Sequence, residues 1–161
     1  MDRLWSPWRY QYVSRASPGD ACIFCEKSAS DRDRENLVLY RGKHNFVLLN
    51  LFPYTNGHLM IAPYRHVAGL AGAGEAVLAE MMRLTVEAER ALGEAYRPRG
   101  LNLGMNLGEC AGAGIAGHIH MHVLPRWMGD ANFMSTVGET RVLPEDLETT
   151  YDKLAPLFGR A

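Results

Sequence analysis

Three histidines alternate with apolar residues near the end of the chain, in the segment His-Ile-His-Met-His-Val-Leu-Pro-Arg over residues 118–126. Alternate side chains of a β-strand point to the same face of a sheet. The spacing therefore predicts that His118, His120 and His122 project together while the apolar residues between them enter the core. Each imidazole in such a row must be hydrogen-bonded, coordinated or solvated. A functional site explains three of them better than an exposed, solvated strand face does.

The chemistry that such a row favours is attack on phosphorus. A neutral imidazole is both a nucleophile and a proton carrier near pH 7. It attacks a phosphorus atom well when backbone N–H groups and donor side chains hold the phosphate oxygens. The loop before the row, residues 108–114, is rich in Gly and Ala, which would let backbone amides approach a phosphate closely.

Two cysteines, Cys22 and Cys25, form a Cys-x-x-Cys pair near the start of the chain. The pair could be a redox pair, half of a zinc site or two buried thiols, but no thioredoxin-like βαβ pattern follows it. A zinc site would need two further ligands. The third cysteine, Cys110, lies in the loop before the histidines and is expected to be a small filler. An odd total of three argues against a disulfide framework.

The elements that must position these residues are mostly strands. Strands are predicted at 37–40 and 45–50 around a turn, and at 58–62, 101–106 and 119–124. Apolar residues at steps of three or four predict one long helix within 74–97, ended by Pro98, and a final helix is expected within 144–158. Residues 26–36 are polar without an apolar period and are expected to form a loop. The pattern predicts the α+β class, with an antiparallel sheet of about five strands.

Composition indicates a single domain of 161 residues, with an aromatic arm (1–21), a core (22–126) and a C-terminal extension (127–161). The formal charge of −1 argues against nucleic acid or an anionic membrane as a partner held by bulk electrostatics. No apolar stretch is long enough for a membrane span, and the start lacks the apolar region of a signal peptide. We therefore expect a cytoplasmic protein.

The histidine pattern resembles the histidine triad (HIT) superfamily of nucleotide hydrolases and transferases. Other segments match the family in order and spacing: Leu-Asn-Leu-Phe-Pro at 49–53, Gly-His-Leu-Met-Ile-Ala-Pro at 57–63 and Asn-Leu-Gly at 106–108. The resemblance covers about residues 22–126. The opening residues 2–9, which include Trp5 and Trp8, and the segment 127–133 resemble the bacterial branch that includes diadenosine tetraphosphate phosphorylases and is related to the fragile-histidine-triad hydrolases.

The resemblance implies a role for each matching residue. His120 would attack the α-phosphate and form a nucleotidyl-histidine intermediate, His122 would contact phosphate oxygens or the leaving group, and His58 would support the row by hydrogen bonding. Substrate-binding positions would be Asn50 at the ribose, Asn106 at the phosphates, and Gly112 and Gly114 in the loop. The zinc-bearing members further imply a structural zinc held by Cys22, Cys25, His66 and His118.

The chain departs from the family's pattern just before the triad. Many relatives have a Gln followed by Ser or Thr there, whereas this chain has Gly-Ile-Ala-Gly at 114–117, in a loop that is one residue longer counted from Asn106. The resemblance favours cleavage of dinucleoside polyphosphates, with phosphate or water as the acceptor. A nucleotide phosphoramidase and a non-catalytic nucleotide-binding protein are the alternatives. Relatives pair as symmetric dimers, which implies a homodimer.

Overall fold

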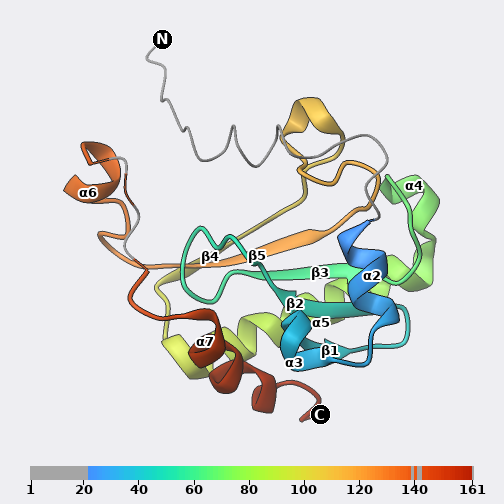
Figure 1. Cartoon of the computed structure of the whole chain (residues 1–161), viewed down its shortest axis with the longest axis horizontal. Coiled ribbons are helices and arrows are strands. Elements are labelled where there is room, and N and C mark those ends of the chain that lie inside the picture. Colours follow the sequence, from blue (N-terminus) through green and yellow to red (C-terminus); the bar gives the residue numbers. More distant parts are fainter. Residues whose placement is uncertain (1–21, 139, 141–142, 161) are drawn as a thin grey trace.

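The fold is built on one five-stranded antiparallel sheet, as predicted (Figure 1). The computed structural model describes residues 22–138, 140 and 143–160, so the predicted N-terminal arm lies outside the described residues. The strands lie in the order β1-β2-β3-β5-β4. Their bounds are β1 Val38–Arg41, β2 Asn45–Leu49, β3 Leu59–Pro63, β4 Gly100–Gly104 and β5 Met121–Arg126.

Both faces of the central strands are buried. Every residue of β2 and β3 is buried, which matches their nearly continuous apolar sequence. Val47, Leu49 and Ile61 belong to the larger hydrophobic cluster, which includes the buried residues of the long helix. Their neighbours in the chain, such as Leu48 and Met60, belong to a second cluster that contains Phe24. The alternation along each strand therefore divides the core into two layers, one on either face of the sheet.

The long helix, α5 (Glu75–Tyr96), confirms the prediction made from the apolar period. It buries Met81, Leu84, Ala88, Ala91 and Leu92 and ends at Arg97, which has a left-handed φ of 47°, just before Pro98. The expected final helix is shorter than predicted. It forms α7 (Leu147–Leu154), followed by a 3₁₀ turn at Ala155–Leu157. Leu154, Leu157 and Phe158 join the same core as α5.

The expected loop at 26–36 is wrong. The chain forms α2 (Ile23–Ala29) and the single-turn α3 (Asp33–Asn36) there. A side chain at the end of β1, Arg41, holds this region. Its guanidinium donates to the carbonyl oxygens of Ser28 at 2.9 Å, Lys27 at 3.2 Å and Ser30. It also pairs with the carboxylate of Asp33. Because α2 buries only Phe24 and α3 buries no residue, the sequence has no apolar period there.

Three further short helices were not predicted. They are α4 (Leu70–Ala73), α6 (Phe133–Thr136) and a 3₁₀ turn at Glu109–Ala111. Within the described part of the chain, no helix combines the length and the apolar character that crossing a membrane requires.

A buried carboxylate joins α5 to the turn between β1 and β2. The carboxylate of Glu80 accepts hydrogen bonds from the backbone amides of Lys43 (2.9 Å), His44 (2.6 Å) and Asn45 (2.7 Å), and from the Asn45 side chain (2.9 Å). Burial alone would raise the pKa of Glu80, but these hydrogen bonds to the charged form lower it overall. The contact fixes the position of the helix against the strand edge.

Candidate functional site

The histidine row lies where the chain enters β5. His122 is in the strand, and His118 and His120 come just before it, in a segment where the amide of Ile119 donates to the carbonyl of Val67 at 2.8 Å. Ile119 and Val123 are buried in the cluster that faces α5. His118 and His120 lie on the other face, where their rings pack against that of Phe24 at centroid distances of 5.1 and 4.8 Å. The predicted alternation is present, although the strand begins two residues later than expected.

The tautomer of His120 follows from its only hydrogen bond in the described structure. Its Nδ1 lies 2.9 Å from the backbone carbonyl oxygen of His118. A carbonyl oxygen can only accept, so Nδ1 carries the proton and Nε2 carries a lone pair. Burial lowers the pKa of His120, and the bond to the carbonyl opposes this only in part. The fold therefore favours the neutral imidazole of His120, with its lone pair on Nε2.

A second chain of hydrogen bonds fixes His58 and His122. The backbone amide of Tyr54 donates to Nδ1 of His58 at 3.2 Å, and the side-chain amide of Asn50 lies 3.3 Å from the same nitrogen. His58 must then carry its proton on Nε2, which lies 2.9 Å from Nδ1 of His122. His122 is left with its own proton on Nε2. The same reasoning thus gives a donor nitrogen on His122 and an acceptor nitrogen on His120.

Both members of this chain are strongly biased toward the neutral form. Burial, with smaller contributions from His122 and His120, lowers the pKa of His58 to about 3. Burial and the neighbouring His120 lower the pKa of His122 to about 4. The rings of His120 and His122 lie edge to face with centroids 4.8 Å apart. A positive charge on the ring of His58 or His122 would be costly, so both side chains stay neutral over the physiological range.

The Gly- and Ala-rich loop folds on itself. The backbone amides of Ala111 and Ala113 both donate to the carbonyl oxygen of Gly108. The backbone amide of Gly112 donates to the carbonyl oxygen of Glu109. Asn106 donates from its side chain to the carbonyl of Gly112 at 3.3 Å. Gly108 and Gly112 have φ values of 85° and 88°, which explains why glycine stands at both turns. Three of the amides expected to hold phosphate are therefore used within the loop.

The structure brings four predicted metal ligands together. Donor atoms of Cys22, Cys25, His66 and His118 all lie within 4.8 Å of one another. Nδ1 of His118 is 3.3 Å from the Cys22 sulfur and 3.7 Å from the Cys25 sulfur, and Nδ1 of His66 is 3.4 Å from the Cys25 sulfur. A tetrahedron with the usual zinc–sulfur and zinc–nitrogen bond lengths has sulfur–nitrogen edges of about 3.5 Å. The cluster has the composition and the spacing of a closed Cys₂His₂ site.

The surroundings of the cluster agree with metal binding. Nε2 of His118 lies 2.8 Å from the carbonyl oxygen of Pro63, so it carries the proton and leaves Nδ1 with a lone pair facing the sulfurs. Burial and the neighbouring Cys22 raise the pKa of the Cys25 thiol, a cost that a bound cation would remove. A Cβ on Gly117 would lie 3.3 Å from the His66 ring, so a larger residue there would require the ring to shift slightly.

Sequence reasoning missed two residues of the site. Tyr54 supplies the amide that sets the tautomer of His58, and its ring packs on the rings of His58 and His122 at 4.8 and 6.3 Å. Phe24 supports the rings of His118 and His120. Phe24 lies between Cys22 and Cys25, and this position was the sequence signal that could have identified it. Tyr54 acts through its backbone amide, so its residue type does not indicate this role.

An antiparallel sheet that carries an alternating histidine row, with tautomers fixed by backbone groups, defines the class of histidine triad proteins. The chain belongs to the HIT domain family, whose model matches residues 31–128.

Two kinds of relative support this assignment. The AP-4-A phosphorylase of Mycobacterium tuberculosis (strain ATCC 25618 / H37Rv) is 41% identical over 168 residues, covering 99% of this chain and 86% of the relative. A zinc-bound histidine triad family protein from Mycobacterium smegmatis has a similar solved structure, with a TM-score of 0.69 at 27% identity over 85% of this chain and 92% of the other. A HIT family member from Bacillus subtilis superimposes with a TM-score of 0.62 at 25% identity, covering 88% of this chain and all of that one.

Proposed function

We propose that this protein is a nucleotidyl transferase that cleaves dinucleoside polyphosphates such as diadenosine tetraphosphate at the α-phosphate. The observation that carries the proposal is the free lone pair on Nε2 of His120, a neutral imidazole held in place by the carbonyl of His118. The 41% identity to a protein named AP-4-A phosphorylase, over nearly the whole chain, supports the choice of substrate.

In the proposed first step, Nε2 of His120 forms a bond to the α-phosphorus while the bond to the bridging oxygen breaks. The leaving nucleotide takes the electron pair of that bond. His122 carries a proton on Nε2, held there by the bond from His58 to its Nδ1, and is placed to donate to the phosphate oxygens or the leaving group. In the second step inorganic phosphate attacks the same phosphorus, the phosphorus–nitrogen bond breaks and His120 is regenerated. The name of the Mycobacterium tuberculosis relative favours phosphate over water as the acceptor.

We assign the remaining contacts to groups around this pair. Asn50, fixed through its Oδ1 by the amide of Phe52 at 3.0 Å, would hold the ribose of the attacked nucleotide. Asn106, with Gly112 and Gly114 of the loop, would face the phosphates. Since three loop amides already have partners, binding of the phosphates would draw more on the side chains of Asn106 and His122 than on backbone N–H groups.

We propose zinc as the cation of the Cys₂His₂ cluster. With four protein ligands it would have no open position, so its contribution would be structural rather than to activate water. The cluster would tie Cys22 and Cys25 to the start of the catalytic segment and so fix the position of His120, two residues beyond His118. Free thiols used as ligands fit a reducing compartment, and we place the protein in the cytoplasm.

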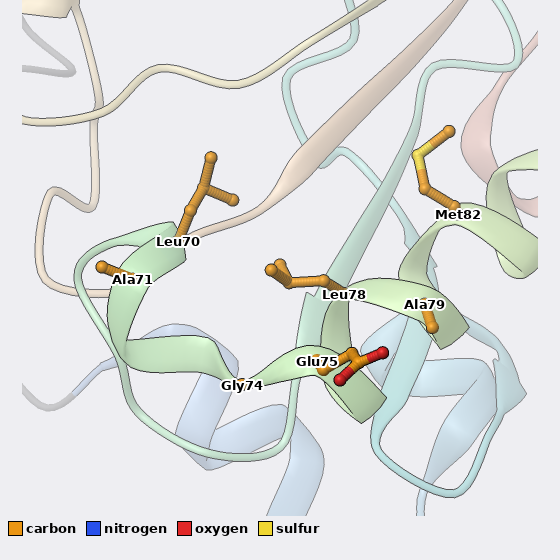
Figure 2. A pocket seen from close by; sticks show the side chains of 7 residues that line it. All are labelled: Leu70, Ala71, Gly74, Glu75, Leu78, Ala79 and Met82. Carbon is orange, nitrogen blue, oxygen red and sulfur yellow. The ribbon is translucent and has the colours of Figure 1, made fainter.

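We also propose a homodimer. Met82 and Val86 on the outer face of α5 are 53% and 62% exposed. Near Met82, the start of α5 and α4 form a shallow, open apolar hollow of about 570 Å³, in which Leu78 points toward α4 and Leu70 (Figure 2). On the sheet, β4 is an edge strand with most of its residues exposed. A second copy would cover both surfaces.

The deciding experiment is incubation with diadenosine tetraphosphate, with and without inorganic phosphate, followed by nucleotide chromatography. Phosphate-dependent release of ADP and ATP would establish a phosphorylase. AMP and ATP in plain buffer would establish a hydrolase. No turnover of this substrate, together with rapid cleavage of an adenosine phosphoramidate, would replace the proposal with a phosphoramidase, and binding without any turnover would leave a nucleotide-binding protein.

A further inference from the structure

The segment between β2 and β3, the end of β5 and the C-terminal segment come together at one end of the sheet (Figure 1). Residues of these three segments line a cavity of about 370 Å³. Three aromatic side chains from three different parts of the chain line it: Tyr54, Tyr96 and Trp127. The rings of Tyr96 and Trp127 lie edge to face, with centroids 6.4 Å apart. The volume and the aromatic lining are those of a small-molecule site.

Hydrogen bonds to a partly buried carboxylate connect the residues of one wall of the cavity. Glu145 accepts hydrogen bonds from the hydroxyl of Tyr96 and from the hydroxyl of Thr150 at 2.8 Å, and it pairs with the ammonium of Lys153. The Lys153 ammonium also lies 5.5 Å from the centre of the Tyr96 ring. These contacts fix the Tyr96 ring and join α7 to the end of α5, so the cavity is pre-formed.

The cavity adjoins the histidines. Tyr54, which lines it, packs against His58 and His122, and the hydroxyl of Thr55 donates to the carbonyl of Pro125 at 3.2 Å. Along the chain the order is His120, His122 and then Trp127. A polyphosphate chain attached to phosphorus at His120 and running past His122 along β5 would therefore lead toward the cavity.

The polar lining selects the chemistry of the occupant. Lys153 is the single cation among the described residues that line the cavity, and it already pairs with Glu145, while Asp130 pairs with Arg126. Because no unpaired cation of the described chain lines the cavity, a phosphate inside it is disfavoured. Asn56 also lines the cavity and donates from Nδ2 to the carbonyl of Glu145 at 3.4 Å. An uncharged planar ring, such as adenine, suits the aromatic walls.

We infer that this cavity binds the base of the second nucleoside of the substrate, the one that departs with the leaving group. The inference rests on the proposed function and deepens it: the enzyme would prefer a nucleotide with a base at both ends over one with the same phosphate chain and a single base. Trp127 would be the main determinant of that preference.

The test compares diadenosine tetraphosphate with adenosine 5′-tetraphosphate, which has the same number of phosphates and lacks the second nucleoside. The proteins are the wild type, Trp127→Ala, Trp127→Phe and, as a matched control in the same turn, Met128→Ala, whose side chain is 88% exposed. We expect Trp127→Ala to lower kcat/KM for diadenosine tetraphosphate about tenfold, in the range found for loss of base–aromatic stacking. In Trp127→Ala, turnover of adenosine tetraphosphate should change less than about twofold. Trp127→Phe should recover most of the lost kcat/KM for diadenosine tetraphosphate. Met128→Ala should match the wild type on both substrates.

An equal loss on both substrates would overturn the inference, because a merely structural tryptophan would affect them alike. Unchanged kinetics in Trp127→Ala would overturn it as well. In either case wild-type turnover of diadenosine tetraphosphate would leave the proposed function standing. If the wild type cleaves neither substrate, the proposed function itself fails, and the two failures are thereby distinguished.

Discussion

At the scale of single residues, backbone groups decide where each imidazole carries its proton. The carbonyl of His118 leaves a lone pair on Nε2 of His120, and the amide of Tyr54, acting through His58, leaves a proton on Nε2 of His122. Neither assignment requires a charged partner. Two histidines on the same face thus differ in proton position, although the alternation of the sequence makes them equivalent, and the proposed function gives them different roles.

The first prediction separates these roles. His120→Asn should lower turnover by several orders of magnitude and leave nucleotide affinity within about tenfold, because the group acts only as the phosphorus–nitrogen bond forms. Acid is expected to cleave the adduct and alkali to spare it, so wild-type protein denatured in alkali after mixing with labelled substrate should retain covalent nucleotide. The label should be absent from His120→Asn and present, reduced, in His122→Asn. The opposite pattern would make His122 the nucleophile.

A second prediction concerns stability and pH. The pKa of His58 falls from an ordinary 6.5 to about 3 on folding, so below pH 6.5 the unfolded chain takes up a proton that the folded chain refuses. The stability contribution is complete above pH 6.5 and is lost as pH falls toward 3, by about 2 kcal/mol at pH 5.

Urea unfolding at pH 7.5 and pH 5.0 would measure this loss in the wild type and in His58→Gln, which has no group titrating in that range at this position. We expect the wild type to lose about 2 kcal/mol more than the variant between the two pH values. Other groups, the metal ligands included, are common to both proteins and cancel in the comparison. Equal losses would show that His58 does not resist protonation.

At the scale of elements, the metal cluster draws its ligands from three separate stretches of chain: the start of α2, the segment after β3 and the segment before β5. Because α2 has a single buried residue, Phe24, little apolar packing holds it to the sheet. A bound cation would add to the contacts of Arg41 in holding this region, and Phe24 would in turn hold the rings of His118 and His120 in place.

The third prediction follows from that arrangement. Protein purified without chelator should contain close to one zinc per chain, and Cys22→Ser should lose the metal and unfold at a lower temperature, since a structural site contributes folding free energy. Cys110→Ser is the matched control, because Cys110 is exposed and lies outside the cluster. Metal analysis and calorimetry of the three proteins would measure both effects. Stoichiometric iron, or loss of metal without any change in melting temperature, would contradict the assignment.

The elements also show what the sequence could predict. The sheet and α5 were predictable from the spacing of their apolar residues. Apolar residues that recur every two positions indicate a strand with a buried face, and those that recur about every 3.6 positions indicate a helix with a buried face. The histidine row and the Cys₂His₂ cluster were visible as spacing and through family resemblance. The helices α2 and α3 were not predictable, since α2 buries one residue and α3 buries none, and the guanidinium of Arg41 holds the carbonyls at the end of α2 and the Asp33 carboxylate of α3. The closed loop around Gly112 was missed because hydrogen bonds between backbone groups leave no mark in residue type.

At the scale of the whole molecule, the described chain leaves two surfaces that a monomer does not explain. One is the outer face of α5 with the adjoining apolar hollow at α4, and the other is the open edge of β4, where Leu103 is 51% exposed (Figures 1 and 2). An unpaired strand edge and an apolar helix face are both surfaces that proteins normally cover.

The last prediction is therefore that the protein is a dimer at micromolar concentration, as sedimentation equilibrium would measure. Val86→Glu should raise the dimer dissociation constant about 100-fold or more, because a two-fold interface would bury two unpaired carboxylates, each costing several kcal/mol. Glu89→Lys, on an exposed position of the same helix, should leave the dimer intact. Far-ultraviolet circular dichroism of Val86→Glu should match the wild type, which would separate dissociation from unfolding. A wild type that sediments as a monomer would contradict the proposed assembly.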